Sequence, residues 1–181
     1  MNKVWLTALY LLSVPSLHAQ VTTTRSLQFD LSKLGMVING EQICNDSRSR
    51  FQDFSTSGMD QIIAAGPKAV PVLIRMISDR RMANTREPLI CYWPGMAIGD
   101  IAFCVLTDLF TDTAGRTTVP GADWNDLLGP GNIGASWEQL HGFIKKHGSG
   151  ALQARWLRVW DKYKGEVFWD SKERCFRQTT S

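Results

Sequence analysis

The chain has 181 residues, of which 44% are hydrophobic and 20% are charged, and its formal net charge is +3 at pH 7. This length fits one domain that can bury a full hydrophobic core. The charge is too small, and the basic residues are too scattered, to indicate nucleic-acid binding or attachment to an anionic membrane.

The first segment is typical of a signal peptide. Lys3 supplies a positive charge, and the apolar stretch over residues 4–17 has about the length of a signal-peptide core. Pro15 would break a spanning helix, and the stretch is shorter than the roughly 20 apolar residues that cross a bilayer. We therefore expect a signal peptide over residues 1–19 and a secreted or periplasmic single domain over residues 20–181, without a membrane span. A retained N-terminal anchor is the alternative.

The stretch from 20 to 56 is weakly patterned. Residues 21–29 fit either a short strand or a flexible lead-in. Asn39 and Gly40 stand between two short apolar runs. This predicts a β-hairpin, because the dipeptide is favoured in two-residue hairpin turns.

Two short helices are predicted between residues 57 and 80. Apolar residues at helical spacing indicate a first helix that Gly66 ends, since glycine takes the left-handed conformation without steric cost. Pro67 fits the turn. Pro71 fits the first turn of a second helix that runs to about Arg80, because its missing N–H is not needed there. This second helix is apolar on nearly every side, which predicts that other elements cover it.

The short helix, the Gly-Pro turn and the second helix that opens with AVPVLI together resemble one unit of the HEAT-like helical repeat proteins. The resemblance covers about residues 57–80, and no second copy occurs at a fixed period. The matching residues are Gly66, Ala69, Val70, Pro71, Leu73 and Ile74. The resemblance implies layered helices, and a chance helical hairpin is the alternative.

Further helices and a second hairpin are predicted later in the chain. Apolar faces at helical spacing indicate helices over residues 96–110, between 136 and 148, and over 151–163. Two apolar runs around a polar turn predict a β-hairpin over residues 166–178. The glycine- and proline-rich segment 111–135 is predicted as a long loop, and loops of this length are usually functional or disordered. The fold class is therefore mainly α: an irregular layered helical domain, with a HEAT-like helical hairpin, packed helices and a short C-terminal β-hairpin.

Four cysteines lie in the part expected to be exported: Cys44, Cys91, Cys104 and Cys175. Their spacing matches no metal motif. An oxidising compartment permits disulfides, and four cysteines allow three pairings, among which the sequence does not choose. We expect at least one disulfide. Cys104 falls in an apolar helical run, where a buried free thiol is the alternative.

No catalytic, metal or cofactor motif occurs in the sequence, so we expect no cofactor and no metal site. Asp100 and Asp108 share one side of a predicted helix at a separation of about 12 Å, which is too far for the carboxylate pair of a glycosidase. Either could work with an acid of the long loop, Asp123 or Asp126. Asp123 is also placed to cap a single helical turn within that loop. Structural roles for Asp100 as a helix cap and for Asp108 on a solvated face are the alternatives.

Two groups of tryptophans have different expected roles. Trp93 and Trp124 lie in proline- and glycine-rich connections, where an aromatic ring can stack on a sugar, anchor a protein partner or pin its own loop. Trp137, Trp156 and Trp160 fall on the apolar faces of predicted helices, and we expect them in the core.

These features favour an exported interaction module of the cell envelope, such as an inhibitor or scaffold, whose partner is another protein. We expect its binding surface at the loop 111–135 and the helix ends near it. The candidate binding residues are Trp93, Asp100, Asp123, Trp124 and Asp126. The alternatives are an envelope hydrolase that uses the acids, and a small-ligand or glycan binder that uses the tryptophans.

Overall fold

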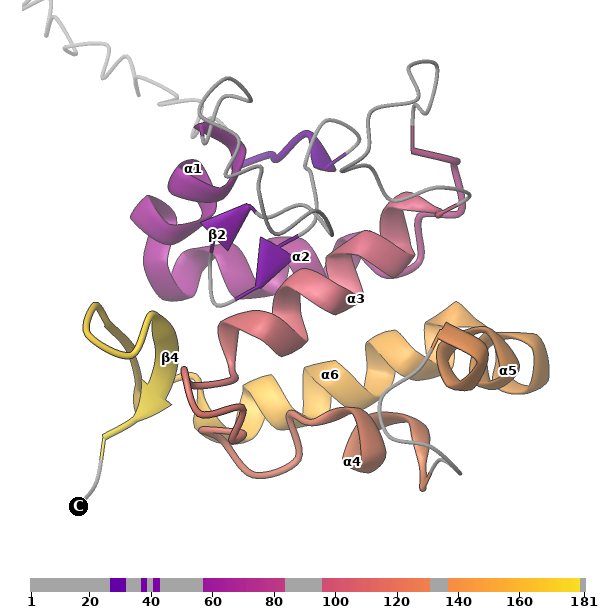
Figure 1. The fold of residues 1–181 in the computed structure, drawn as a ribbon. Coiled ribbons are helices and arrows are strands. Elements are labelled where there is room, and N and C mark those ends of the chain that lie inside the picture. The colour runs from indigo at the N-terminus through magenta and orange to yellow at the C-terminus, as the bar shows by residue number, and fades with distance from the viewer. Residues whose placement is uncertain are drawn as a thin grey trace, which may run out of the picture.

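The computed structural model describes residues 27–31, 37–38, 41–42, 57–83, 96–130 and 137–179. Over these residues the fold is mainly helical and ends in a short antiparallel two-stranded sheet (Figure 1), which confirms the predicted fold class. The expected signal peptide, Cys44, Cys91 and Trp93 lie outside the described residues.

The elements follow one another in a simple order. The helices are α1 (Ser57–Ala65), the 3-10 helix η2 (Gly66–Lys68), α2 (Ala69–Met76), α3 (Ile98–Leu109), α4 (Trp124–Leu128), α5 (Trp137–His147) and α6 (Ser149–Tyr163). The strands are β1 (Val37–Ile38), β2 (Glu41–Gln42), β3 (Val167–Asp170) and β4 (Cys175–Gln178). β1 pairs with β2, and β3 pairs with β4, both antiparallel. Both predicted hairpins are thus confirmed, but residues 27–29 form no strand.

The first two helices form the predicted helical hairpin. Gly66 follows α1 with φ of 57°, the left-handed conformation expected of it. The second helix begins at Ala69, two residues earlier than predicted, so Pro71 lies within its first turn. It ends at Met76 rather than near Arg80. A 3-10 turn links the two helices, and α2 begins early because Lys68 and Ala69 already have right-handed helical dihedral angles.

The core lies between α2, α3 and α6. α2 packs against both other helices, as its apolar surface predicts, and every residue of α3 except Asp108 is buried. The turn after α2 approaches the start of α3 so closely that only glycine fits at position 99. A Cβ atom on Gly99 would lie 2.1 Å from the carbonyl oxygen of Ile77, and the Gly99 N–H donates to the carbonyl of Asp79 (2.8 Å).

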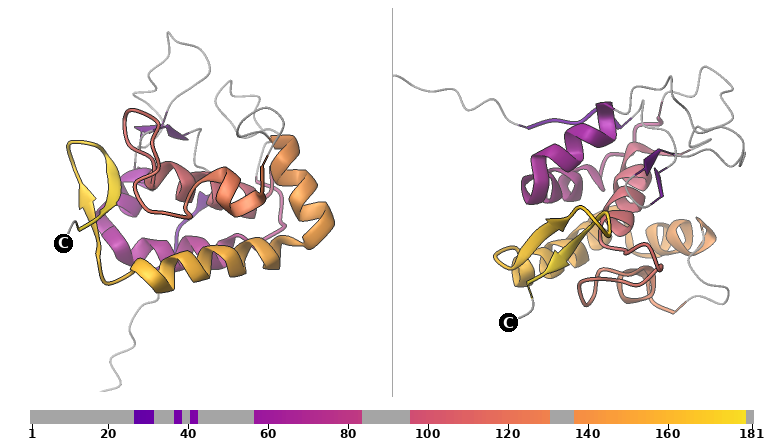
Figure 2. Two further views of the ribbon diagram at one scale, coloured as in Figure 1. Left: turned by 90° about the horizontal axis from the view of Figure 1, so that it is seen from below. Right: turned by 60° about the vertical axis from the view of Figure 1, so that its left-hand side comes forward.

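The C-terminal hairpin closes one end of this core. Phe176 of β4 is fully buried, and its ring centroid lies 5.5 Å from that of Phe110 and 5.3 Å from that of Trp169. β3 packs against η2, so the last strands of the chain cover the turn between its first two helices (Figures 1 and 2).

The three tryptophans on the apolar faces of the predicted helices differ in how deeply they are buried. Trp156 of α6 is fully buried, as predicted, although its indole Nε1 has no hydrogen-bond partner among the described residues. Trp160 is half-buried against the core. Trp137 was predicted in the core, and this is wrong: 36% of its surface is exposed. It stands at the first residue of α5, where its ring contacts that of Trp124.

Two of the four cysteines can be placed. Cys104 and Cys175 are buried free thiols, so neither is bonded to the other. The predicted disulfide stays untested at the two cysteines outside the described residues. Within the described ranges, no helix combines the length and the apolar character needed to cross a membrane.

Candidate functional site

One face of the molecule combines most of the residues singled out in the sequence. Seen from below (Figure 2, left), the hairpin β3–β4, the loop 111–123, α4 and α5 follow one another across it. We call it the loop face.

A buried carboxylate gives the loop its shape. Asp112 accepts hydrogen bonds from the backbone N–H groups of Ala114 (3.0 Å) and Arg116 (2.9 Å), and the Arg116 guanidinium contacts it at 2.8 Å. These bonds, first the one from the Arg116 backbone, hold the pKa of Asp112 below its ordinary value. The segment predicted as a long loop is therefore ordered over residues 111–130, and it includes the predicted single turn α4.

The loop is also bonded to its neighbours. The backbone N–H of Thr118 donates to the carbonyl of Phe110 (2.9 Å), and its hydroxyl donates to the carbonyl of Phe176 in β4. The hydroxyl of Thr113 donates to Glu173 in the hairpin turn (2.8 Å). The loop is thus held against the hairpin by a few polar groups.

The two acids predicted in the loop lie together at the start of α4. Asp123 caps the helix, since its carboxylate accepts the N–H of Asp126 (2.8 Å). The two carboxyl groups also contact each other. Their shared hydrogen bond and mutual repulsion raise the pKa of Asp126. Neither carboxylate forms an ion pair with any other residue of the described ranges.

The far end of α4 is fixed by two side chains from the helices beside it. Arg155 of α6 donates to the carbonyl of Leu127 (2.6 Å) and stacks over the ring of Phe143 at 4.6 Å. Gln139 of α5 donates to the carbonyl of Gly129. α4 is therefore a rigid support for the aromatic ring that it carries.

Three rings form a row from the core to the surface, which we call the aromatic row: Trp124, Trp137 and His141. Trp124 packs edge-on against the buried Phe103 (4.9 Å between centroids) and edge-on against Trp137 (6.1 Å). Trp137 lies 6.3 Å from His141, one turn further along α5. The row anchors the exposed ring of Trp137 through Trp124 to the core.

His141 also belongs to an ionic cluster around a buried carboxylate, which consists of Asp100, Arg80 and His141. Asp100 in the first turn of α3 is almost fully buried and accepts the N–H of Ala97, the capping role expected of it. Its carboxylate also contacts Arg80 (2.6 Å, Nη1 to Oδ1) and His141 (3.6 Å, Nε2 to Oδ2). Arg80 and His141 are 44% and 50% exposed, so one buried carboxylate positions two cationic or hydrogen-bonding groups at the surface.

The structure therefore joins the predicted residues in a different way than expected. Asp100 does not pair with a loop acid but with Arg80 and His141. The loop acids pair with each other, and Trp124 joins the aromatic row. The sequence did not single out Arg80 or His141, and it placed Trp137 in the core. Arg80 follows α2, whereas Trp137 and His141 belong to α5, and no spacing links either element to Asp100.

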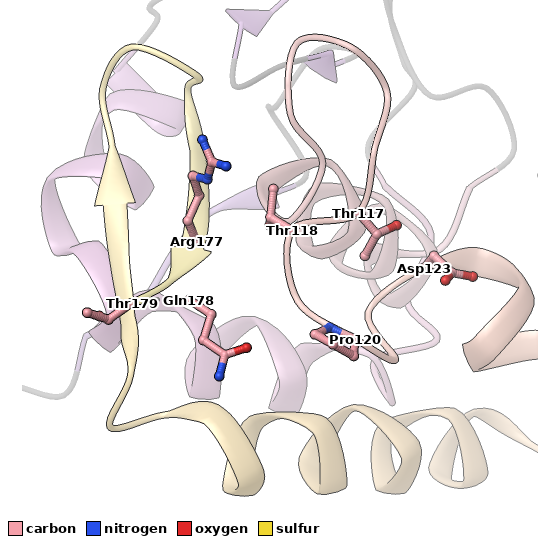
Figure 3. Close-up of a pocket in the computed structure, with 7 residues that line it drawn as sticks. All are labelled: Thr117, Thr118, Pro120, Asp123, Arg177, Gln178 and Thr179. Carbon is pink, nitrogen blue, oxygen red and sulfur yellow. The ribbon is translucent and has the colours of Figure 1, made fainter. Parts of the chain in front are cut away.

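A hollow lies on the other side of α4, between the loop and β4 (Figure 3). Its volume is about 660 Å³. Its lining consists of hydrogen-bonding side chains and one proline: Thr117, Thr118, Pro120, Asp123, Arg177, Gln178 and Thr179. Nothing in the sequence pattern indicated it, because its two walls are about 60 residues apart along the chain.

Comparison with known proteins adds no family to this geometry. No family model, no curated protein and no solved structure matches the chain. The resemblance of residues 57–80 to a HEAT-like unit stays a prediction. In the described part of the chain, no group of three or more His, Cys, Asp or Glu side chains could hold a metal ion.

Proposed function

We propose that this chain is an exported interaction module of the cell envelope and that another protein binds it at the aromatic row. The observation that carries this proposal is the position of Trp137. It is a large aromatic side chain, 36% exposed, on a row of rings that reaches the core. Tryptophan dominates binding energy at protein interfaces when it is rigidly presented, because it buries much apolar area at a small cost in side-chain entropy.

The surroundings of Trp137 fit the polar edge of such an interface. His141 is half-exposed beside Trp137, and it shares the carboxylate of Asp100 with Arg80, which is also half-exposed. Protein interfaces typically combine an apolar centre with a polar rim, and arginine is enriched in them. A fixed guanidinium also loses less freedom when a partner carboxylate or carbonyl binds it.

The two alternatives find less support in this geometry. A hydrolase that uses Asp100 with the loop acids would need these carboxylates to converge. Asp100 is instead engaged by Arg80 and the N–H of Ala97, while Asp123 and Asp126 contact each other. A glycan binder would need a free aromatic face in the loop. Trp124 is half-buried, and two rings contact it edge-on.

The test is affinity capture from the native cell envelope with the chain lacking residues 1–19 as bait. The bait carries either no change, Trp137→Ala, or Leu157→Ala as a matched control. Leu157 is a large apolar residue of similar exposure, 40%, on α6. We expect a specific protein that the unchanged and Leu157→Ala baits retain and that Trp137→Ala loses. Capture that is the same for all three baits, or no specific capture at all, would overturn the proposal.

A further inference from the structure

The edge of β4 that faces the loop has backbone groups without a partner among the described residues. The N–H of Thr179 donates to the carbonyl of Glu166 in the hairpin (2.7 Å). In an antiparallel sheet, hydrogen-bonded and non-hydrogen-bonded residue pairs alternate. The next pair, Val167 and Gln178, is therefore not hydrogen-bonded, so the N–H and C=O of Gln178 point away from β3.

The loop already completes this edge at one residue. Phe176 lies two positions before Gln178, so its carbonyl points the same way, and it accepts the Thr118 hydroxyl. Thr118 thus takes the place of a neighbouring strand at Phe176. No group in the described ranges does so at Gln178, which borders the hollow instead (Figure 3).

The hollow, with a volume of about 660 Å³, lies between two walls. β4 forms one wall, and the loop residues Thr117 and Pro120 form the other. The Thr118 hydroxyl already bonds the carbonyl of Phe176, so Gln178 is the residue of this edge that a bound segment can reach through the hollow. Contact at one residue suits a lone extended segment better than the full strand edge of a second folded copy.

The charge at one end of the hollow defines the chemistry of that segment. Asp123 lines the hollow. The carboxyl group of Asp126 contacts that of Asp123, and their shared hydrogen bond and the charge of Asp123 raise the pKa of Asp126. Two adjacent carboxylates that form no ion pair with a described basic residue create a negative potential at this end of the hollow, which attracts a cation. Arg177, which also lines the hollow, is already paired with Asp170 (3.3 Å). A lysine or arginine in the bound segment would form an ion pair with both carboxylates.

We propose that the hollow beside β4 binds an extended polypeptide segment of a partner protein as a third strand, with a lysine or arginine of that segment at Asp123 and Asp126. The backbone of Gln178 supplies the strand-to-strand hydrogen bonds, and the loop side chains supply further donors and acceptors. Strand addition of this kind gives affinity through main-chain bonds and specificity through side-chain contacts. This site is separate from the aromatic row and does not depend on it.

The test uses a phage-displayed library of random twelve-residue peptides, selected against the chain lacking residues 1–19. The most enriched peptide is synthesised and titrated by calorimetry, and amide exchange at Gln178 is followed by NMR. We expect enriched peptides to carry lysine or arginine. At saturation, the best one should slow amide exchange of Gln178 at least about tenfold, as a new hydrogen bond requires.

Matched variants assign the bound peptide to the hollow. Asp123→Asn keeps the helix cap, because asparagine is an equally good N-cap residue, but removes the charge. We expect it to weaken peptide binding about fivefold, the effect of one partly exposed ion pair. Asp161→Asn removes an exposed acid on α6, and Trp137→Ala alters the aromatic row. Both should leave peptide affinity unchanged.

Three results would overturn the proposal. The first is that no peptide is enriched. The second is a bound peptide that leaves exchange at Gln178 unchanged and is insensitive to Asp123→Asn. The third is a Gln178 amide already protected in the free chain, which would mean that the chain's own segment covers the edge. Because Trp137→Ala serves as a control here, failure at the hollow and failure at the aromatic row are distinguishable.

Discussion

The pair α2–α3 and the loop 111–123 both border the core, but different forces hold them. In α2 and α3 nearly every side chain is apolar and buried, so many contacts of similar kind share the stabilisation. In the loop, Asp112 and Thr118 make most of the bonds that give the segment its shape. The comparison teaches that burial by periodic apolar residues tolerates change at most positions, whereas a loop held by polar groups depends on a few.

The two regions should also fail in different ways. Loss of a contact in α2–α3 lowers the free energy of unfolding of the whole domain, because those helices form its centre. Loss of a bond in the loop opens the loop locally while the helices remain folded, since local openings need less free energy than global unfolding. The following experiments test this difference, from the largest expected effect to the smallest.

The largest effect is expected where α2 and α3 approach most closely. Gly99→Ala would place a Cβ atom 2.1 Å from the carbonyl oxygen of Ile77, so the backbone must move. We expect a loss of about 3 kcal/mol in the free energy of unfolding, measured by urea denaturation. Gly142→Ala on α5 is the matched control, because a Cβ there meets nothing within 4 Å. It should stabilise the helix by about 0.5–1 kcal/mol. Equal effects of the two changes would contradict the close approach.

The next effect concerns the ionic cluster that ties α3 to both α5 and the turn after α2. Asp100→Asn keeps the shape of the side chain but leaves Arg80 and His141 without their carboxylate. We expect a loss of about 2 kcal/mol in the free energy of unfolding, because the hydrogen bonds from the Arg80 guanidinium lose their buried carboxylate. Asp79→Asn removes the surface contact to Arg81 and should cost less than about 1 kcal/mol. If Asp79→Asn lowers the free energy of unfolding as much as Asp100→Asn does, burial does not make the contacts of Asp100 stronger than a surface contact.

A smaller effect, confined to the loop, is expected in acid. The pKa of Asp112 is lowered in the folded chain from an ordinary value of 3.8. Its ionised form therefore stabilises the loop fully above that value, and this contribution is lost as the pH falls through the lowered pKa. Thermal unfolding and amide exchange of residues 111–118, followed from pH 7 to pH 2, should show the loop opening before the helices. Asp112→Asn should show an open loop at every pH. A loop that opens only with the helices would contradict the local character of its bonds.

The smallest effect is a difference in reactivity with no change in fold. Burial raises the pKa of the Cys104 thiol, with the nearby Asp100 charge adding to it, and raises that of Cys175 to about 11. Iodoacetamide at pH 8 should therefore label both thiols slowly in the folded chain and rapidly in guanidinium chloride, as mass spectrometry can quantify. Cys104 sits in α3 and Cys175 beside the loop, so faster labelling of Cys175 would report loop opening. Detection of either thiol in a disulfide would contradict the structure.

The fold could be predicted where one short stretch of sequence carries the whole signal. The stripe that includes Leu152, Trp156 and Tyr163 predicts α6 because its burial follows the period of a helix. The α4 turn was found because its cap, Asp123, is adjacent to it. The end of α2 was not predicted correctly. The four residues after Met76 continue the helical pattern, but the chain turns there, and Gly99 packs against Ile77.

The candidate site was predictable only in its local part. Asp123, Trp124 and Asp126 are neighbours in sequence, so their association needed no knowledge of the fold. Arg80 and His141 meet Asp100 across 20 and 41 positions, and no periodicity relates them. Trp137 was misplaced for a related reason: a stripe gives the direction of a side chain, but not whether another element lies there to cover it.

The contact between β3 and η2 joins parts of the chain that are about 100 residues apart in sequence. The turn at residues 66–68 is among the first parts of the described chain to be synthesised, and the strand that covers it is among the last. One face of α2 likewise stays uncovered until α6 has been synthesised and packs against it. A nascent chain that has released only the first helices must therefore remain incompletely packed until its last residues emerge. Such long-range closure slows folding, because the entropy of a long loop is lost before its contacts form.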